Sequence, residues 1–272
     1  MLEIAIALAT GLLVGSFLNV CIYRLPRDLS VVRPRSYCPA CNAPLAWYDN
    51  VPVLSYILLR GRCRNCGARI SLRYPAVEVV TALLFVLIVV VLGVNLRAAR
   101  LCLFSSMVLS LVVCDIEQRI LPDELTLGGL LAGLLSAIFV PMDPEYAHSL
   151  LPADWDISWL SLGESVLGAA FASGILWGVG SLYQKVRHKE GLGLGDVKMM
   201  AMVGSFLGIS GAFQTLILGS LAGTVIGTLY IFLRKKDWAT YELPFGAFLG
   251  VAAVLLAFQR AGVSSSWLPL LR

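Results

Sequence analysis

The chain has 272 residues, of which 58% are hydrophobic and only 14% are charged. Soluble domains average about 45–50% apolar and about 25% charged residues, so this composition excludes an ordinary soluble protein. The formal net charge of +4 at pH 7 is explained by membrane topology, because Lys and Arg concentrate in cytoplasmic loops. Several apolar runs approach the ~20 residues that cross a bilayer. We therefore expect an all-α fold, a polytopic membrane helix bundle of about eight spans.

The first predicted span, residues 4–23, has Glu3 instead of a basic segment ahead of it and lacks a small-residue cleavage site. We therefore expect a retained span and not a signal peptide. Gly11 and Gly15 are spaced for close helix packing, and Asn19 is polar and near the end of the span. The other predicted spans are residues 77–94, 98–114, 125–140, 162–183, 199–209, 211–233 and 243–258. Glycines at four-residue spacing predict close packing of the seventh span: Gly219, Gly223 and Gly227.

Residues 24–74 form the only sizeable polar segment, with nine arginines and no lysine. The segment contains two Cys-x-x-Cys pairs, Cys38/Cys41 and Cys63/Cys66, with 21 residues between them. This spacing is typical of a zinc ribbon, in which four thiolates bind one tetrahedral Zn²⁺. Such a closed site is structural, because no coordination position stays open for water. A redox dithiol or paired disulfides are alternatives, disfavoured because a basic loop should face the reducing cytosol.

Acidic residues stand near the ends of three predicted spans. Glu78 is near the start of the second span, where it either snorkels to the interface or has a functional role. Asp115 closes the third span and is followed by Leu121-Pro122-Asp123. Because proline directly precedes Asp123, we expect Asp123 to be the N-cap of the fourth span.

The stretch Gly193-Leu194-Gly195-Asp196-Val197-Lys198 precedes the short sixth span. An ionisable residue at the head of a membrane segment is a functional candidate, and the two glycines let another backbone approach closely. Alone, the stretch also fits a glycine-rich helix start with a capping Asp. Asp115 and Asp196 at the ends of two spans instead suggest an intramembrane aspartic protease. Lys198 is placed to bias the ionisation of such a pair.

With the N-terminus outside, four loops face the cytoplasm: residues 24–74, 115–124, 184–198 and 234–242. They contain nine, one, four and three of the 21 basic residues, or 17 altogether, as expected for cytoplasmic loops. This topology puts both aspartates on the cytoplasmic side, as a catalytic dyad requires. We expect three parts: a first span (1–23), a cytoplasmic four-Cys zinc-binding loop (24–74) and a transmembrane aspartic peptidase bundle (75–272).

Motifs along nearly the whole chain are shared with one family. They are residues 15–26 (GSFLNVCIYRLP), both Cys-x-x-Cys pairs, Arg73-Tyr74-Pro75 leading to Glu78, Asp115 with Leu121-Pro122-Asp123, residues 191–198 (GLGLGDVK) and residues 244–249 (PFGAFL). On these motifs the chain resembles the bacterial type IV prepilin peptidases, GxGD-type leader peptidase/N-methyltransferases of type IV pilus and type II secretion systems. One departure is Ala247, where the family usually has a second proline. We expect it to alter the start of the last helix and to leave the aspartates unaffected.

The resemblance implies that Asp115 and Asp196 are the catalytic pair, and that Gly193, Gly195 and Lys198 belong to the supporting loop. It implies cleavage of the short basic leader from type IV prepilin or pseudopilin precursors. The resemblance also implies that this cleavage takes place on the cytoplasmic side of the bacterial inner membrane. It also implies N-methylation of the new N-terminus with S-adenosylmethionine.

No motif supports the methylation step, because no Gly-x-Gly-x-x-Gly follows a strand. We place this second site near the cytoplasmic ends of the first two spans, with Asn19 and Glu78 as polar candidates for substrate binding or methyl transfer.

Two other function classes remain to be weighed. An ion-coupled transporter would need carboxylates at the bilayer midplane and broken helices in paired repeats, whereas Asp115 and Asp196 lie at span ends on one face. A membrane-anchored nucleic-acid module would use the Arg-rich zinc loop, but this loop lacks the interleaved aromatics of a base-stacking surface. We therefore expect precursor proteins and membrane lipid as partners, and no nucleic acid.

Overall fold

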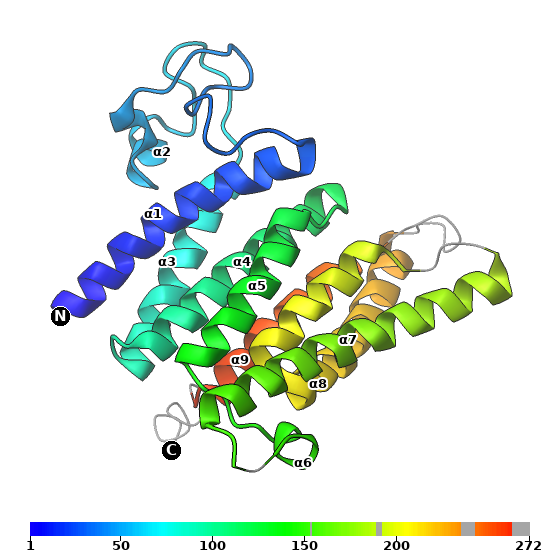
Figure 1. The fold of residues 1–272 in the computed structure, drawn as a ribbon. Helices are drawn as coiled ribbons and strands as arrows, with labels where there is room; N and C mark the ends of the chain where they lie inside the picture. The colour runs from blue at the N-terminus through cyan, green and yellow to red at the C-terminus, as the bar shows by residue number, and fades with distance from the viewer. Residues whose placement is uncertain (153, 189–191, 235–242, 263–272) are drawn as a thin grey trace. The chain divides into compact units, whose positions relative to one another are not determined.

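The computed structural model describes residues 1–152, 154–188, 192–234 and 243–262. These residues form helices and loops, with two isolated β-bridges and no strand, so the expected all-α fold is confirmed for the described part. Figure 1 shows the arrangement. The helices are α1 (Leu2–Arg24), η1 (Leu25–Arg27), η2 (Trp47–Asn50), α2 (Leu54–Leu58), α3 (Arg73–Leu92), α4 (Leu96–Gln118), α5 (Asp123–Phe139), α6 (Ala147–Leu150), α7 (Ile157–Arg187), α8 (Leu194–Arg234) and α9 (Phe245–Arg260).

Within the described ranges, five helical segments are long and apolar enough to cross a membrane: Leu2–Arg27, Arg73–Leu92, Leu96–Gln118, Ile157–Arg187 and Leu194–Arg234. Helices α5 and α9 are shorter, with 17 and 16 residues. The predicted sixth and seventh spans both lie within α8, which is interrupted at Gly208. Length and composition therefore confirm five apolar helices of spanning length among the described residues, and the expected count of eight spans is not confirmed. The difference comes from two short helices and from one break inside a continuous helix.

The chain forms two compact units, Met1–Ser106 and Met107–Arg272, which are described separately. In the first unit, α1 packs against α3 at the two predicted glycines. A Cβ atom at Gly11 would lie 2.6 Å from the Ala82 Cα, and one at Gly15 would lie 2.7 Å from the Glu78 Cα. The close helix approach expected from these small residues is therefore confirmed.

In the second unit, α8 packs against α7 and α9 through glycines. Gly168 of α7 and Gly204 of α8 are so close that a Cβ on either would meet the carbonyl oxygen of the other. The glycines spaced four residues apart in the second half of α8 face three residues of segment 243–249, which confirms their predicted packing role. These pairs are Gly219 with Leu249, Gly223 with Phe248 and Gly227 with Leu243.

The break in α8 is held from both sides by neighbouring helices. Gly208 has φ 69° and ψ −173°, so the helical hydrogen-bond pattern stops there. Glu164 of α7, only 2% exposed, accepts hydrogen bonds through Oε1 from the Ile209 amide (3.1 Å) and through Oε2 from the two amides at the start of α6 (2.9 and 3.0 Å). Arg260 of α9 donates from Nη1 to the Leu207 carbonyl oxygen (3.2 Å). Two of the backbone groups at the break, the Ile209 amide and the Leu207 carbonyl, therefore have side-chain partners.

Candidate active site and metal centre

Asp115 lies in the last turn of α4, and its carboxylate is tied to the start of α9. The residue is 5% exposed, and its Oδ2 accepts a hydrogen bond from the Ala247 amide (2.7 Å). The expectation that Ala247 leaves the aspartates unaffected is therefore wrong. A proline at this position would have no N–H to donate, so the residue that departs from the family pattern contributes directly to the site.

Asp196 is the third residue of α8 and is half-buried. A Cβ atom at Gly246, in the first turn of α9, would lie 2.9 Å from the Asp196 Oδ1 and 3.2 Å from the Asp115 Oδ2. The two oxygens are therefore no farther apart than the sum of these distances. The structure brings the two predicted aspartates together, from α4 and α8, over one glycine of α9.

The two glycines before Asp196 have different surroundings. A Cβ at Gly195 would lie 3.1 Å from the Leu121 Cβ, so this glycine lets the turn after α4 approach α8. Gly193 is exposed, and a Cβ there would face the Asp196 Oδ2 at 3.7 Å. Neither glycine therefore places a side chain against the Asp196 carboxylate.

Lys198 forms an ion pair with Asp123. Its Nζ lies 2.7 Å from Oδ1 and 2.8 Å from Oδ2 of that carboxylate. The sequence suggested that Asp123 is the N-cap of α5, but the structure shows that it is not. Pro122 occupies that position in an extended conformation and makes no side-chain cap hydrogen bond. Asp123 is instead the first helical residue, and its side chain turns towards the start of α8.

Sequence reasoning overlooked two residues of this unit. Gly246 lies in the motif 244–249. Its position two residues after Pro244, in an apolar segment, was the available signal. Glu164 was overlooked within the predicted span 162–183, although an acidic residue inside a membrane segment is a functional or structural candidate by default.

The four cysteines of the predicted zinc ribbon form one cluster in the first unit. Their Sγ atoms all lie within 4.8 Å of one another, and Cys38 and Cys66 Sγ are 3.9 Å apart. Tetrahedral zinc with Zn–S bonds of about 2.3 Å requires sulfurs roughly 3.8 Å apart. The donor set therefore fits a zinc ion.

The two Cys-x-x-Cys pairs have the same turn geometry. The Asn42 amide donates to the Cys38 carbonyl oxygen (2.8 Å), and the Gly67 amide donates to the Cys63 carbonyl oxygen (2.9 Å). Asn42 and Gly67 both have positive φ values, 56° and 71°, a conformation that Gly and Asn adopt most readily. The isolated β-bridges, 37 to 44 and 62 to 69, close the two turns.

Backbone amides favour the thiolate at two of the four cysteines. The backbone amides of Cys66 and Asn65 lower the pKa of the Cys63 thiol to about 7. The Ala43 amide lowers the pKa of the Cys41 thiol. The Ala68 amide also lowers the pKa of Cys66, but the adjacent thiols raise it overall to about 11. Backbone amides thus stabilise negative charge on Cys63 and Cys41, and a bound cation would stabilise the thiolates further.

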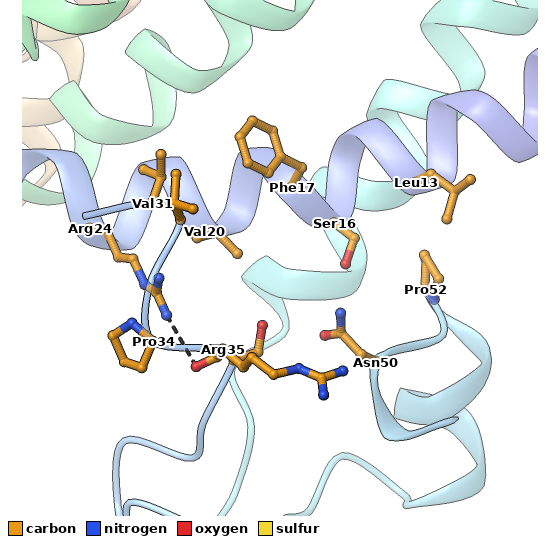
Figure 2. A pocket seen from close by; sticks show the side chains of 12 residues that line it. Leu13, Ser16, Phe17, Val20, Arg24, Val31, Pro34, Arg35, Asn50 and Pro52 are labelled. Carbon is orange, nitrogen blue, oxygen red and sulfur yellow. Dashed lines mark hydrogen bonds between the residues drawn. The ribbon is translucent and has the colours of Figure 1, made fainter. Parts of the chain in front are cut away.

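A pocket of about 320 Å³ lies between α1 and the loop 24–74 (Figure 2). Leu13 and Phe17 form part of an apolar wall, and Ser16 and Asn50 supply polar groups. Arg24 stands at one end, where it donates to the carbonyl oxygens of Ser30 (2.9 Å) and Arg35 (3.3 Å). The volume is at the lower end of the range for small-molecule sites.

Asn19 and Glu78, the polar candidates of the first unit, lie at the interface of α1 and α3. Asn19 donates through Nδ2 to the Tyr74 carbonyl oxygen (2.9 Å), whereas its buried Oδ1 has no hydrogen-bond partner. The Oε2 of Glu78 accepts a hydrogen bond from the Val53 amide (2.8 Å). Neither residue lines the pocket. Asn19 directly precedes Val20, and Glu78 packs against Gly15, which directly precedes Ser16; Val20 and Ser16 both line the pocket.

Two family models match the chain. The Bacterial Peptidase A24 N-terminal domain matches residues 9–92, and the Type IV leader peptidase family matches residues 102–228. No solved structure matches the chain significantly.

Several relatives are named prepilin leader peptidase/N-methyltransferase. The Aeromonas hydrophila protein is 34% identical over 270 residues, which cover 89% of this chain and 86% of the relative. The Pseudomonas putida protein is 35% identical over 271 residues, covering 92% and 88%. The Myxococcus xanthus protein is 38% identical over 221 residues, covering 81% and 61%.

Proposed function

Because the chain belongs to the type IV leader peptidase family, we propose that it removes the leader from type IV prepilin or pseudopilin precursors with Asp115 and Asp196. The observation that carries this proposal is the convergence of both carboxylates on Gly246. Two carboxylates in such proximity share one proton, because both cannot ionise without strong repulsion. A shared proton gives the site one base and one acid at the same time.

The reaction follows the scheme of the soluble aspartic proteases, which are a standard worked case. The ionised carboxylate takes a proton from water, and the water oxygen attacks the scissile carbonyl carbon. The protonated carboxyl polarises the carbonyl oxygen, and the tetrahedral intermediate collapses when the leaving amine receives a proton. Gly193 supports this role, since its open surroundings leave room for an extended substrate backbone beside Asp196.

The basic-residue distribution supports an active site on the cytoplasmic side of the bacterial inner membrane. Both aspartates are at helix ends that this topology assigns to the cytoplasm. Four residues of this distribution lie outside the described residues, namely Lys189, Lys235, Lys236 and Arg272. Gly191, the first residue of the motif 191–198, also lies outside them. We also retain the division into a first span (1–23), a metal-binding loop (24–74) and a peptidase bundle (75–272).

A second activity, N-methylation of the new N-terminus, rests on the names of the relatives. S-adenosylmethionine would supply the methyl group. The pocket beside α1 fits a ligand of moderate size with its apolar wall and few polar groups. Asn19 has an unpartnered buried oxygen, and a carboxylate such as Glu78 could orient an α-ammonium group. We therefore keep these two residues as the candidates that hold the substrate amine.

The zinc ion is proposed as a structural element of the loop 24–74. Cys38, Cys41, Cys63 and Cys66 would be its four ligands, and metal binding would contribute to the folding of a loop with little apolar core.

One experiment tests both activities. The purified protein is incubated with a tagged prepilin precursor and S-adenosylmethionine, and the product is analysed by mass spectrometry. Loss of the leader with the added mass of one methyl group is expected. An intact precursor would refute the peptidase assignment, and a shortened but unmethylated product would refute only the second activity. Ion uptake by proteoliposomes without any cleavage would favour the transporter alternative.

A further inference from the structure

Residues 47–59 form the most apolar part of the loop between α1 and α3. Residues 51–59 read Val-Pro-Val-Leu-Ser-Tyr-Ile-Leu-Leu, and α2 lies at their centre. The side chains of Trp47, Leu54, Ile57 and Leu58 are all more than half exposed. A cluster of exposed apolar side chains on one short segment marks an interaction surface.

This segment lies beside α1 and not beyond its end, and Figure 1 shows α2 next to the middle of that helix. The Val53 amide is bonded to Glu78, which is five residues and about 7.5 Å along the axis of α3 from its first residue, Arg73. Pro52 lines the same pocket as Leu13, which is eleven residues, or about 16 Å, before the end of α1. The segment is therefore at the level of lipid-facing parts of both helices.

Chain at membrane depth must satisfy its backbone polar groups without water, and several amides of this segment have partners within the protein. The amides of Ser55, Ile57 and Leu59 donate to carbonyl oxygens four residues earlier (3.1, 3.0 and 2.9 Å). The amide of Val53, which has φ 59° and lies before the helix, is bonded to the Glu78 carboxylate. Glu78 thus supplies the acceptor for an amide that lies before the first turn of α2.

The flanking residues are those found at membrane interfaces. Trp47 and Tyr48 precede the apolar residues, and Arg60 and Arg62 follow them. Trp and Tyr side chains concentrate at the headgroup level, and basic residues are attracted to anionic lipids. Both neighbouring helices also have exposed apolar side chains, among them Leu13 of α1 and Leu83 of α3.

The geometry points to segment 47–59 as an interfacial anchor, with its apolar face inserted among lipid acyl chains and its arginines at the headgroups. The loop 24–74 is then not a domain suspended in water. The two Cys-x-x-Cys pairs flank a segment that is embedded in the leaflet beside α1. We assign lipid as the occupant of the exposed apolar surface, because the segment is bonded to Glu78 of α3 and borders the same pocket as Leu13, an exposed apolar residue of α1.

Photo-crosslinking of the full chain in lipid nanodiscs tests this inference. The photoreactive residue p-benzoylphenylalanine is placed at Ile57, at Leu83 in α3 as the lipid-facing control, and at Ala40, an exposed position of the first Cys-x-x-Cys turn. After illumination, lipid adducts are measured by mass spectrometry, and the zinc content of each variant verifies that the loop is folded.

We expect lipid adducts at Ile57 and Leu83 in similar yield, and several-fold fewer at Ala40. Adducts at Leu83 without adducts at Ile57 would overturn the inference. A crosslink from Ile57 to a second polypeptide in place of lipid would also overturn it, and would assign the surface to contact between proteins. Leader cleavage does not enter this test, so its outcome is independent of the proposed activity.

Discussion

Replacing Gly246 by alanine is expected to slow leader cleavage about tenfold. The added Cβ would lie 2.9 Å from the Asp196 Oδ1 and 3.2 Å from the Asp115 Oδ2, so both carboxylates must retreat. A misplacement of about 1 Å costs roughly 10²-fold in rate, and a retreat of about 0.5 Å therefore costs roughly tenfold. This corresponds to about 1.4 kcal/mol of transition-state stabilisation.

The assay is the initial rate of cleavage of a prepilin precursor by purified protein, from which kcat and KM are obtained, with Tm measured in parallel. Gly174→Ala is the matched control, because no atom lies within 4 Å of a Cβ at that position of α7. We expect wild-type kcat for the control and unfolding temperatures close to wild type for both variants. A Gly246→Ala protein with wild-type kcat would show that the two carboxylates do not work together over this glycine.

Three further predictions concern the aspartates, the metal and the ion pair. Asp115→Asn and Asp196→Asn should each lower cleavage by about 10²–10⁴-fold at unchanged expression, because an amide cannot exchange the proton; near-normal cleavage by either variant would end the dyad hypothesis. Cys63→Ser should lower the zinc content from one ion per chain and make residues 24–74 more sensitive to proteolysis, and full zinc content by elemental analysis would contradict the four-thiolate site. Lys198→Met removes an exposed ion pair with a contribution of at most about 1 kcal/mol, so Tm and cleavage should change little, whereas a loss of orders of magnitude would place Lys198 in the catalytic machinery.

Residues whose role follows from local spacing could be read from the sequence. Each Cys-x-x-Cys turn is formed by its own local hydrogen bonds. The four-cysteine cluster then needs only one contact between distant segments, that of the first turn with the second. The glycines of α8 could be placed on a packing face because residues four apart share one side of a helix. The helical character of the apolar segments follows from the bilayer, which leaves no other way to satisfy the backbone.

Features that depend on contacts between distant segments could not be read in this way. Gly246 matters because α9 meets the ends of α4 and α8, and no periodicity encodes that meeting. Asp123 looked like a capping residue because proline preceded it, but its partner, Lys198, lies 75 residues further along the chain. The role of Ala247 was misjudged for the same reason, since its amide acts on a carboxylate 132 residues away.

The break at Gly208 leaves the first part of α8, from Leu194 to Leu207, with 14 residues. Such a helix rises about 21 Å, which is less than the ~30 Å thickness of the hydrocarbon layer. This is hydrophobic mismatch, and it means that at least one end of this half-helix lies below the membrane surface. The end at Gly208 tolerates that position, because Glu164 and Arg260 replace the solvent around it. Asp196 stands at the other end, so in the proposed mechanism the short half-helix gives hydrolytic water only a short path to the scissile bond.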